Sequence, residues 1–188
     1  MNACIILEEL NARLEDRVEL TLYGRAAIQL GFPNPPRDTL LSLDVDAVFW
    51  LGQAEQLNET TNFWEAIDQV NKQLGRQGLY ISHFFTEDMV VLRPGWREER
   101  KPISTAWSKI ALYRLSDVDL LLSKLMRDDP QDQQDAWFIL QSASLSMEDV
   151  QRAVQEARVP NVPELEEQFE RASARLMKRL CAGQRGGE

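Results

Sequence analysis

The stretch "LTLYGRAAIQLGFPNPPRDTLLSLDVDAV", Leu20 to Val48, contains the local signals that decide the fold. Apolar and polar residues alternate from Val18 onward, which predicts a strand that ends at Gly24. The run 25–32 predicts a short helix, and the prolines that follow it cannot continue that helix. The run 43–50 is rich in strand-forming apolar residues and predicts a second strand. Strand, glycine, short helix, loop and strand therefore follow one another in this order.

Two aspartates, Asp44 and Asp46, stand one residue apart in the second strand. Residues i and i+2 of a strand point to the same face, so the two carboxylates project together, about 7 Å apart along the strand. Such neighbours raise each other's pKa unless a cation neutralises them, and Mg²⁺ prefers carboxylate, water and phosphate oxygens. The pair therefore predicts a Mg²⁺ site for phosphoryl or nucleotidyl transfer. The alternative is that both aspartates lie at a solvated strand end or edge.

The strand and helix before this pair favour the metal interpretation. A glycine between strand and helix, here Gly24, lets the backbone approach a phosphate, and the amides at a helix N-terminus favour an anion. One element would then bind the triphosphate of a nucleotide while the other holds Mg²⁺. This is the layout that a metal-assisted nucleotidyltransferase needs.

The rest of the sequence up to Leu115 alternates between helix and strand signals. Apolar residues recur at helical spacing in residues 3–16 and 63–74, and a polar stretch at 52–62 leads into the second of these helices. Three further strand candidates follow at residues 79–85, 88–93 and 107–115. The order predicts an α+β fold, a mixed sheet with flanking helices.

From Ser116 the sequence is almost entirely helical. Ser116 is followed by an acid three residues later, which predicts a capped helix start, and Ser146 predicts another. We therefore divide the chain into an α/β core, residues 1–115, and a helical C-terminal region, residues 116–188, packed on that core. We expect the tail 182–188 to be disordered.

The last helix carries one apolar stripe, which either packs on a partner or completes the chain's own core. The stripe consists of Leu165, Phe169, Ala172, Leu176 and Leu180.

Composition limits the kinds of protein that this chain can be. With 21 Lys+Arg against 30 Asp+Glu, the net charge of −9 argues against broad, non-specific nucleic-acid binding. The densest cationic run, "RPGWREERK" at 93–101, is either a solvated loop or a candidate acceptor surface. Cys4 and Cys181 lack metal-site spacing, which fits a reducing cytoplasm. No apolar run approaches the ~20 residues of a membrane span, and the N-terminus turns acidic too soon for a signal peptide.

Two groups of motifs carry a resemblance to a known family. The first is "YGRAAIQLGF", then "RDT" at Arg37 to Thr39, then "LDVDAV"; the second is "DLLLSKLMRDDPQDQQDAWFIL" at 119–140. In this order, over about residues 18 to 142, the chain resembles the minimal nucleotidyltransferase-fold proteins of the AbiEii type and a related branch of uncharacterised nucleotidyltransferase-like proteins. The AbiEii proteins are the toxin half of bacterial abortive-infection and toxin–antitoxin pairs.

The resemblance implies roles for residues in both groups of motifs. In the first group, Gly24 would lie against the nucleotide phosphates, with Arg25 and Thr39 beside the nucleotide, and Asp44 and Asp46 would hold Mg²⁺. In the second group, Lys124 would face the triphosphate or the developing charge, and Asp132 or Asp135 would orient it or act on the acceptor. Arg127 would be the nearby basic residue that contacts the nucleotide.

Each role in the second group has a simpler alternative. Lys124 has Asp128 at i+4, an ordinary surface pair on a helix. Asp132 and Asp135 fall near the start of a helix, where the helix dipole favours acids.

The sequence departs from the family pattern at three places. Arg25 stands where the family has a second small residue, so it either crowds the phosphate loop or binds phosphate itself. Four residues separate Thr39 from Asp44, where the family has about one. A third carboxylate on a later strand is replaced by Ser82 and His83, and Glu87 and Asp88 come just beyond that strand. His83 is a metal ligand or base in one interpretation and a half-buried structural histidine in the other.

Two hypotheses follow from the sequence. In the first, the chain is an enzyme that transfers a nucleotide from an NTP to an RNA or protein acceptor, with a possible antitoxin-like partner and no membrane. In the second, it is a catalytically degenerate member of the fold that binds a nucleotide or a protein. An ion pair from Arg25 to Asp44 or Asp46 would favour the second hypothesis, because a side chain would then occupy the metal site.

Overall fold

The computed structural model describes residues 1–59 and 61–185. The chain forms two compact units, which we describe separately. The first comprises Met1–Glu87 and Glu99–Leu115, and the second comprises Asp88–Glu98 and the residues from Ser116 onward. Within the described ranges, no helix is both long enough and apolar enough to cross a membrane.

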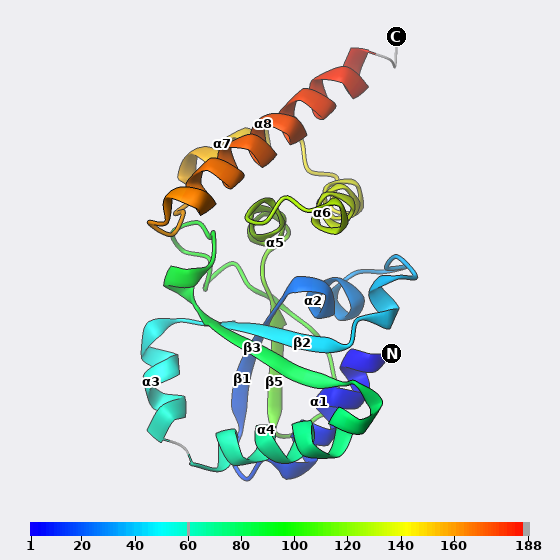
Figure 1. The fold of residues 1–188 in the computed structure, drawn as a ribbon, viewed down its shortest axis with the longest axis vertical. Helices are drawn as coiled ribbons and strands as arrows, with labels where there is room; N and C mark the ends of the chain where they lie inside the picture. Colours follow the sequence, from blue (N-terminus) through cyan, green and yellow to red (C-terminus); the bar gives the residue numbers. More distant parts are fainter. Residues whose placement is uncertain (60, 186–188) are drawn as a thin grey trace. The chain divides into compact units, whose positions relative to one another are not determined.

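A five-stranded mixed sheet forms the centre of the first unit (Figure 1). Its spatial order is β3 (Tyr80–Thr86), β2 (Asp44–Phe49), β1 (Val18–Tyr23), β5 (Ile110–Arg114) and β4 (Lys101–Pro102). β1 is antiparallel to β2 and parallel to β5, whereas β2 is parallel to β3 and β4 is antiparallel to β5. β2 is therefore an interior strand, with β3 at the edge beside it. The predicted α+β class and mixed sheet are confirmed.

Helices α1 (Asn2–Arg13), α2 (Gly24–Gly31) and α4 (Thr61–Leu74) pack against this sheet, and α1 contacts both of the others. Because side chains alternate along a strand, β1 and β2 turn one set of residues toward the core and the other set away from it. The buried core includes Ile6, Leu7, Leu10, Leu20, Leu22, Val45, Ala47, Phe49 and Phe63. Each of these side chains other than that of Ala47 contributes about 1.5–3 kcal/mol of transfer free energy, so the position of β2 is strongly fixed. Asp44 and Asp46 belong to the alternate set of β2 residues.

The second unit contains the helices α5 (Asp117–Leu125), α6 (Pro130–Ser142), α7 (Met147–Glu156) and α8 (Pro163–Arg185). The predicted caps are confirmed: the Ser116 side chain accepts from the Asp119 amide, and Ser146 forms a capping box with Asp149. Phe169, Ala172 and Leu176 of α8 are buried, and α8 packs on α5 and α7. The apolar stripe of α8 therefore completes the chain's own core.

The prediction of a strand at 88–93 is wrong. Residues Glu87–Met89 form a 3-10 turn, and Leu92 makes only an isolated bridge with Arg158. Val90, Val91 and Leu92 are all buried, so this apolar run lacks the alternation of a half-exposed strand. The backbone amide and guanidinium of Arg93 donate to Asp119, at 3.0 Å and 3.0–3.2 Å. These bonds group the segment Asp88–Glu98 with the helices of the second unit.

Three smaller predictions also need correction. The stretch predicted to be a polar lead-in contains a helix, α3 (Leu51–Glu59), which buries Gln53 and Leu57 at helical spacing. The basic run 93–101 ends at Lys101, which is the first residue of the short strand β4. The tail was expected to be disordered from residue 182, but α8 extends to Arg185, and residues 186–188 lie outside the described part of the chain.

Candidate functional site: a glycine beside a carboxylate pair

Gly24 begins α2 with φ +66°, a left-handed conformation that glycine adopts without strain. An ideal Cβ built at this position would lie 3.3 Å from Oδ2 of Asp46. The juxtaposition follows from strand register, because Tyr23, the last residue of β1, pairs with Asp46 across the antiparallel β1–β2 ladder. The start of α2 and the second aspartate are thus such close neighbours that even a Cβ at position 24 would be in tight contact with the carboxylate.

Asp44 and Asp46, the carboxylate pair, point to the same side of β2. Oγ of Ser82 lies 2.8 Å from Oδ1 of Asp46 and 3.3 Å from Oδ2 of Asp44, so one hydroxyl reaches both carboxylates. Ser42 donates a further hydrogen bond of 2.9 Å to Asp44. Because β2 is an interior strand, these aspartates are not on a solvated edge, although Asp44 is the first residue of the strand.

The environment of Asp46 disfavours its charged form. Burial raises the pKa of this carboxyl above its ordinary value, and the neighbouring charge of Asp44 raises it further. The hydrogen bond from Ser82 and the proximity of His83 oppose the shift without cancelling it. A bound cation would relieve this unfavourable charge, which is the property expected of a metal-binding carboxylate.

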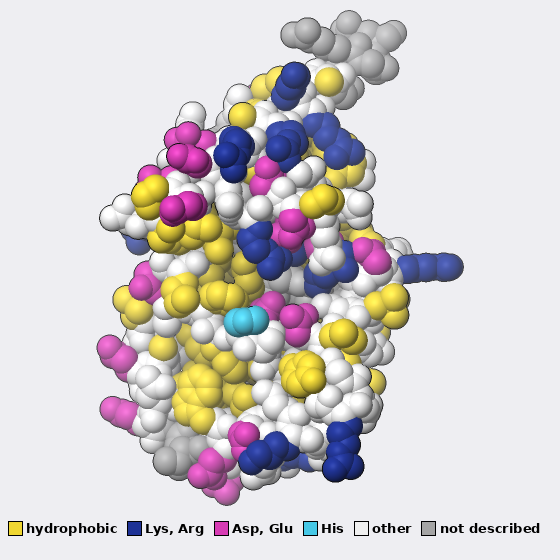
Figure 2. All heavy atoms as spheres, viewed as in Figure 1, with side chains coloured by type: hydrophobic (Ala, Val, Ile, Leu, Met, Phe, Trp, Pro, Cys, Tyr) yellow, Lys and Arg dark blue, Asp and Glu magenta, His cyan; other side chains and the backbone are white. Residues whose placement is uncertain are grey.

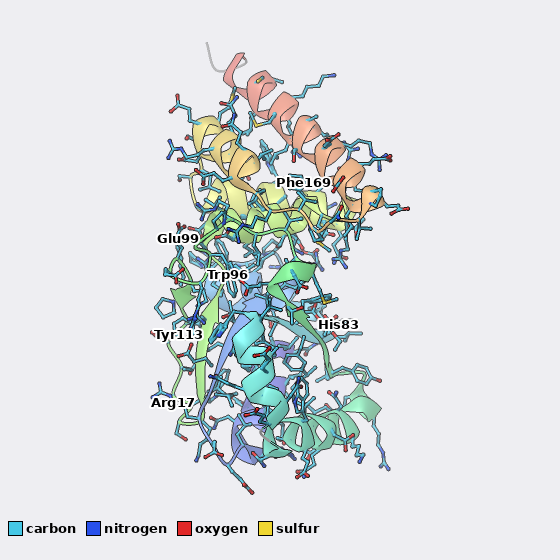
Figure 3. The ribbon with its side chains drawn as sticks, turned by 90° about the vertical axis from the view of Figure 1, so that its left-hand side faces the viewer. Arg17, His83, Trp96, Glu99, Tyr113 and Phe169 are labelled. Carbon is cyan, nitrogen blue, oxygen red and sulfur yellow. The ribbon has the colours of Figure 1, made fainter. Side chains whose placement is uncertain are left out.

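His83 is exposed beside Asp46, so it is not the half-buried structural histidine of the alternative interpretation. Its side chain is 64% exposed, and its Nδ1 lies 3.3 Å from Oδ1 of Asp46. The ring stacks on Phe85 with a centroid separation of 5.5 Å. Figure 2 shows the histidine at the surface near acidic side chains, and Figure 3 shows its position on β3.

A register shift brings Ser82 and His83 to the same carboxylate. The β2–β3 ladder is irregular between Val45 and Asp46, so that Val45 pairs with Ile81 and Asp46 with His83. Ser82 is the extra residue, and both it and His83 therefore reach Asp46. Simple alternation along a strand would direct only one of them there, and no local sequence signal marks the irregularity.

The guanidinium group of Arg25 forms an ion pair with Asp38. Its guanidinium donates to Oδ2 and to the backbone carbonyl of Asp38, and this hydrogen bond lowers the pKa of Asp38. The hydrogen-bond partners of Asp46 are Ser82 and His83. These contacts give no support to the hypothesis that Arg25 neutralises the carboxylate pair.

Thr39 is fully buried at the start of a short 3-10 turn, Thr39–Leu41. Its hydroxyl donates to the carbonyl of Pro36 at 2.6 Å, and its own carbonyl accepts from Gln29 of α2 at 3.2 Å. The residue fastens the loop before β2 to α2. Its contribution to nucleotide binding stays a prediction.

The second unit contains the other predicted site residues, in what we call the lysine cluster: Lys124, Arg127, Asp132 and Asp135. Nζ of Lys124 is 3.0 Å from Asp132 and 2.8 Å from Asp135, and all three side chains are almost completely buried. Arg127 donates to Asp132 from the more exposed side, at 2.9 Å. The alternative of a surface pair between Lys124 and Asp128 is wrong, because Asp128 pairs with Arg175 at 2.7 Å.

The charges of the lysine cluster are mutually satisfied. Burial by itself would raise the pKa of Asp132, but the charge of Lys124 and the hydrogen bond from Arg127 outweigh burial and lower it. Ion pairs with two buried carboxylates hold the ammonium group of Lys124 in one position. The structure thus brings Gly24, Asp44 and Asp46 together in the first unit, and Lys124, Arg127, Asp132 and Asp135 together in the second.

The carboxylate pair fits a divalent cation in its donor chemistry. Two carboxylates share one side of β2, and the missing side chain of Gly24 leaves room at Oδ2 of Asp46. In the part of the chain that the structure describes, no three His, Cys, Asp or Glu side chains are grouped so as to hold a metal ion. Two carboxylates completed by water and phosphate oxygens form the kind of site that Mg²⁺ accepts.

Comparison with known proteins identifies the family to which this chain belongs. Residues 5–172 match the family described as "Nucleotidyltransferase of unknown function (DUF6036)", so the chain belongs to this nucleotidyltransferase family. No curated protein and no solved structure matches the chain.

Proposed function

We propose that this protein is a Mg²⁺-dependent nucleotidyltransferase that transfers a nucleotide from an NTP to a hydroxyl group of an acceptor. The proposal depends above all on one observation, the approach of Gly24 to Oδ2 of Asp46. That contact joins a backbone suited to phosphate with a carboxylate suited to a metal ion. Membership of a nucleotidyltransferase family gives independent support.

In the proposed mechanism, Asp44 and Asp46 hold the metal ion. When bound, the metal neutralises phosphate charge and orients the phosphates for in-line attack. The absence of a side chain at Gly24 allows the triphosphate to approach the backbone at the start of α2, whose amides favour an anion. The hydroxyl of Ser82 lies within hydrogen-bond reach of both carboxylates and donates its single proton to one of them at a time.

The roles proposed for the lysine cluster rest on the resemblance to AbiEii-type proteins. Lys124 would face the triphosphate or the developing charge, and Arg127 would contact the nucleotide. Asp132 or Asp135 would orient Lys124 or act on the acceptor. The ion pairs of Lys124 with both aspartates support the orienting role, because they hold its ammonium group in one place.

The acceptor is proposed to be an RNA or a protein, and the site of action the cytoplasm. By the same resemblance, we propose that the protein belongs to a toxin–antitoxin or abortive-infection pair and has an antitoxin-like protein partner. Induced expression in bacteria should then slow growth, and the Asp44→Ala/Asp46→Ala variant should not. Equal growth with both proteins would contradict the toxin role alone.

A second candidate is a degenerate member of the fold that binds a nucleotide or a partner without turnover. The observation that favours it is the replacement of the third acid by Ser82 and His83 beside Asp46. In this case Asp46 would still bind a metal–nucleotide complex, but no product would form.

The position of the isotope label in the NTP distinguishes an active nucleotidyltransferase from a degenerate member and identifies the reaction. The protein is incubated with Mg²⁺, a total RNA and protein extract, and each NTP labelled at the α- or γ-phosphate. Nucleotidyl transfer predicts that α-label enters macromolecules and that γ-label is released in pyrophosphate, and that Asp44→Ala/Asp46→Ala abolishes both. Transfer of γ-label to macromolecules would contradict nucleotidyl transfer, and binding without any transfer would favour the degenerate member.

A further inference from the structure

Helix α8 has an uneven distribution of charge along its length. Its first two turns contain Glu164, Glu166, Glu167 and Glu170. From residue 171 to residue 182 there is no acid, and four cations follow one another. A chain with a net charge of −9 therefore concentrates positive charge on one half of one helix.

The four cations share one face of α8, which we call the α8 basic face: Arg171, Arg175, Lys178 and Arg179. Their spacing of i, i+4, i+7 and i+8 aligns them along the helix, with steps of about 6 Å along the axis between residues four apart. All four are exposed, whereas the core stripe of Phe169, Ala172 and Leu176 is buried. Figure 2 shows Lys and Arg side chains gathered over this helix.

Neighbouring helices of the second unit extend the α8 basic face. Arg175 pairs with Asp128 in the connection between α5 and α6, and the exposed side chain of Arg127 directly precedes that aspartate. The guanidinium of Arg179 lies 3.8 Å from the ring centroid of Trp137 on α6. Asp128 is only 11% exposed, and its charge is balanced by that of Arg175. The result is a row of cations with an aromatic ring beside it.

We infer that the α8 basic face binds the sugar-phosphate backbone of a single-stranded nucleic acid. A linear row of cations suits a linear polyanion, and three of the four are arginines, whose guanidinium groups bind phosphate through two hydrogen bonds. An aromatic ring within a cationic surface is typical of single-strand binding. If the proposed nucleotidyl transfer is correct, this nucleic acid is the acceptor; only that identification, and not the binding, rests on the proposed function.

The inference is tested by fluorescence anisotropy with a 5′-labelled, mixed-sequence single-stranded RNA, without NTP or metal, over a series of salt concentrations. Arg171→Gln/Lys178→Gln should weaken binding at low salt by roughly tenfold and lower the slope of log K against log salt by about 1.4, since each lost contact removes about 0.7. The matched control is Arg17→Gln/Arg76→Gln, which removes two exposed cations from the first unit and should leave affinity unchanged.

Loss of affinity in the control equal to that in the α8 variant would overturn the inference. So would unchanged affinity in the α8 variant, or no RNA binding by the wild-type protein at low salt. Single-stranded DNA and poly-L-glutamate serve as competitors. Competition by DNA, strong or weak, is compatible with backbone binding, whereas displacement of RNA by poly-L-glutamate at equal charge would indicate a site for an acidic protein and contradict the inference.

Asp44→Ala/Asp46→Ala separates this inference from the proposed function, since we expect that variant to bind RNA like the wild type. If the protein binds no NTP, and RNA binding is lost only in the α8 variant, the proposed enzymatic function is contradicted and the inferred nucleic-acid surface is supported. NTP-dependent activity without RNA binding would support the proposed function and contradict the inferred nucleic-acid surface.

Discussion

At the scale of single residues, the arrangement of the carboxylate pair lowers the stability of the folded protein. Asp46 is partly buried, and both this burial and the neighbouring charge of Asp44 raise its pKa. A fold selected only for stability would place an apolar or hydrogen-bonded neutral side chain there. Unfavourable electrostatics beside a left-handed glycine is the pattern expected of a binding site.

Gly24→Ala tests the contact between the turn and the carboxylate. The left-handed conformation should cost about 1–2 kcal/mol of the free energy of unfolding. The new Cβ should also obstruct the space at Asp46 and weaken MgATP binding by at least about tenfold, equal to 1.4 kcal/mol. Gly78→Ala is the matched control, because Gly78 has φ +72° and no atom within 4 Å of an added Cβ. Denaturant unfolding should show a similar loss in the free energy of unfolding for both variants. Nucleotide titration should show a loss of binding only for Gly24→Ala, and equal binding by the two variants would contradict the proposed site.

Asp46→Asn tests how much the negative charge of Asp46 lowers the free energy of unfolding. The folded-state pKa of Asp46 is raised, so the native state binds the proton more tightly than the unfolded chain and stability is lost as pH rises above the ordinary value of 3.8. The neutral amide removes this loss while it can still accept from Ser82. In metal-free buffer, the variant should therefore be as stable as the wild type or more stable at pH 7, and the difference should shrink toward pH 4. A variant that is less stable at pH 7 than at pH 4, relative to wild type, would show that Asp46 is a structural residue.

At the scale of elements, much of the site follows from local signals and part of it does not. The strand ending at Gly24, the helix after it and the aspartates of β2 were predictable, because alternation, glycine position and caps are local properties of the sequence. The partners of Asp46 were not, because the irregular β2–β3 register that brings in Ser82 and His83 depends on long-range pairing. The burial of Lys124 was missed for a related reason: its aspartate partners belong to the following helix rather than to its own.

Lys124→Met tests the lysine cluster. Removing the ammonium group leaves Asp132 and Asp135 buried, with Arg127 as the remaining cation of the cluster, and should cost about 3–5 kcal/mol of the free energy of unfolding. Lys72→Met provides the control, since Lys72 is 75% exposed and pairs with Asp68 at i−4, an interaction worth about 0.5 kcal/mol or less. Chemical denaturation measures both changes. A cost for Lys124→Met as small as that for Lys72→Met would show that the cluster is not the tightly paired group that the structure describes.

At the scale of the whole molecule, the division into domains at Leu115 stays a prediction, because a domain is defined by independent folding. Asp119 is fully buried, and Arg93, from the segment Asp88–Glu98, supplies its ion pair. We therefore expect residues 116–188 to fold alone only when that segment is also supplied. This dependence could not be predicted from the sequence, because residues 88–93 have the composition of a strand but belong to the helical second unit.

The central claim is that the carboxylate pair and Gly24 form a metal-dependent nucleotide site. Calorimetric titration with each of the four NTPs, with Mg²⁺ and with EDTA, tests it most directly, with Asp44→Ala/Asp46→Ala as the control. We predict Mg²⁺-dependent binding with a Kd on the order of micromolar to millimolar, lost in the variant while its fold is retained. Absence of binding to all four NTPs, or binding that is unchanged by EDTA and by the variant, would contradict the claim.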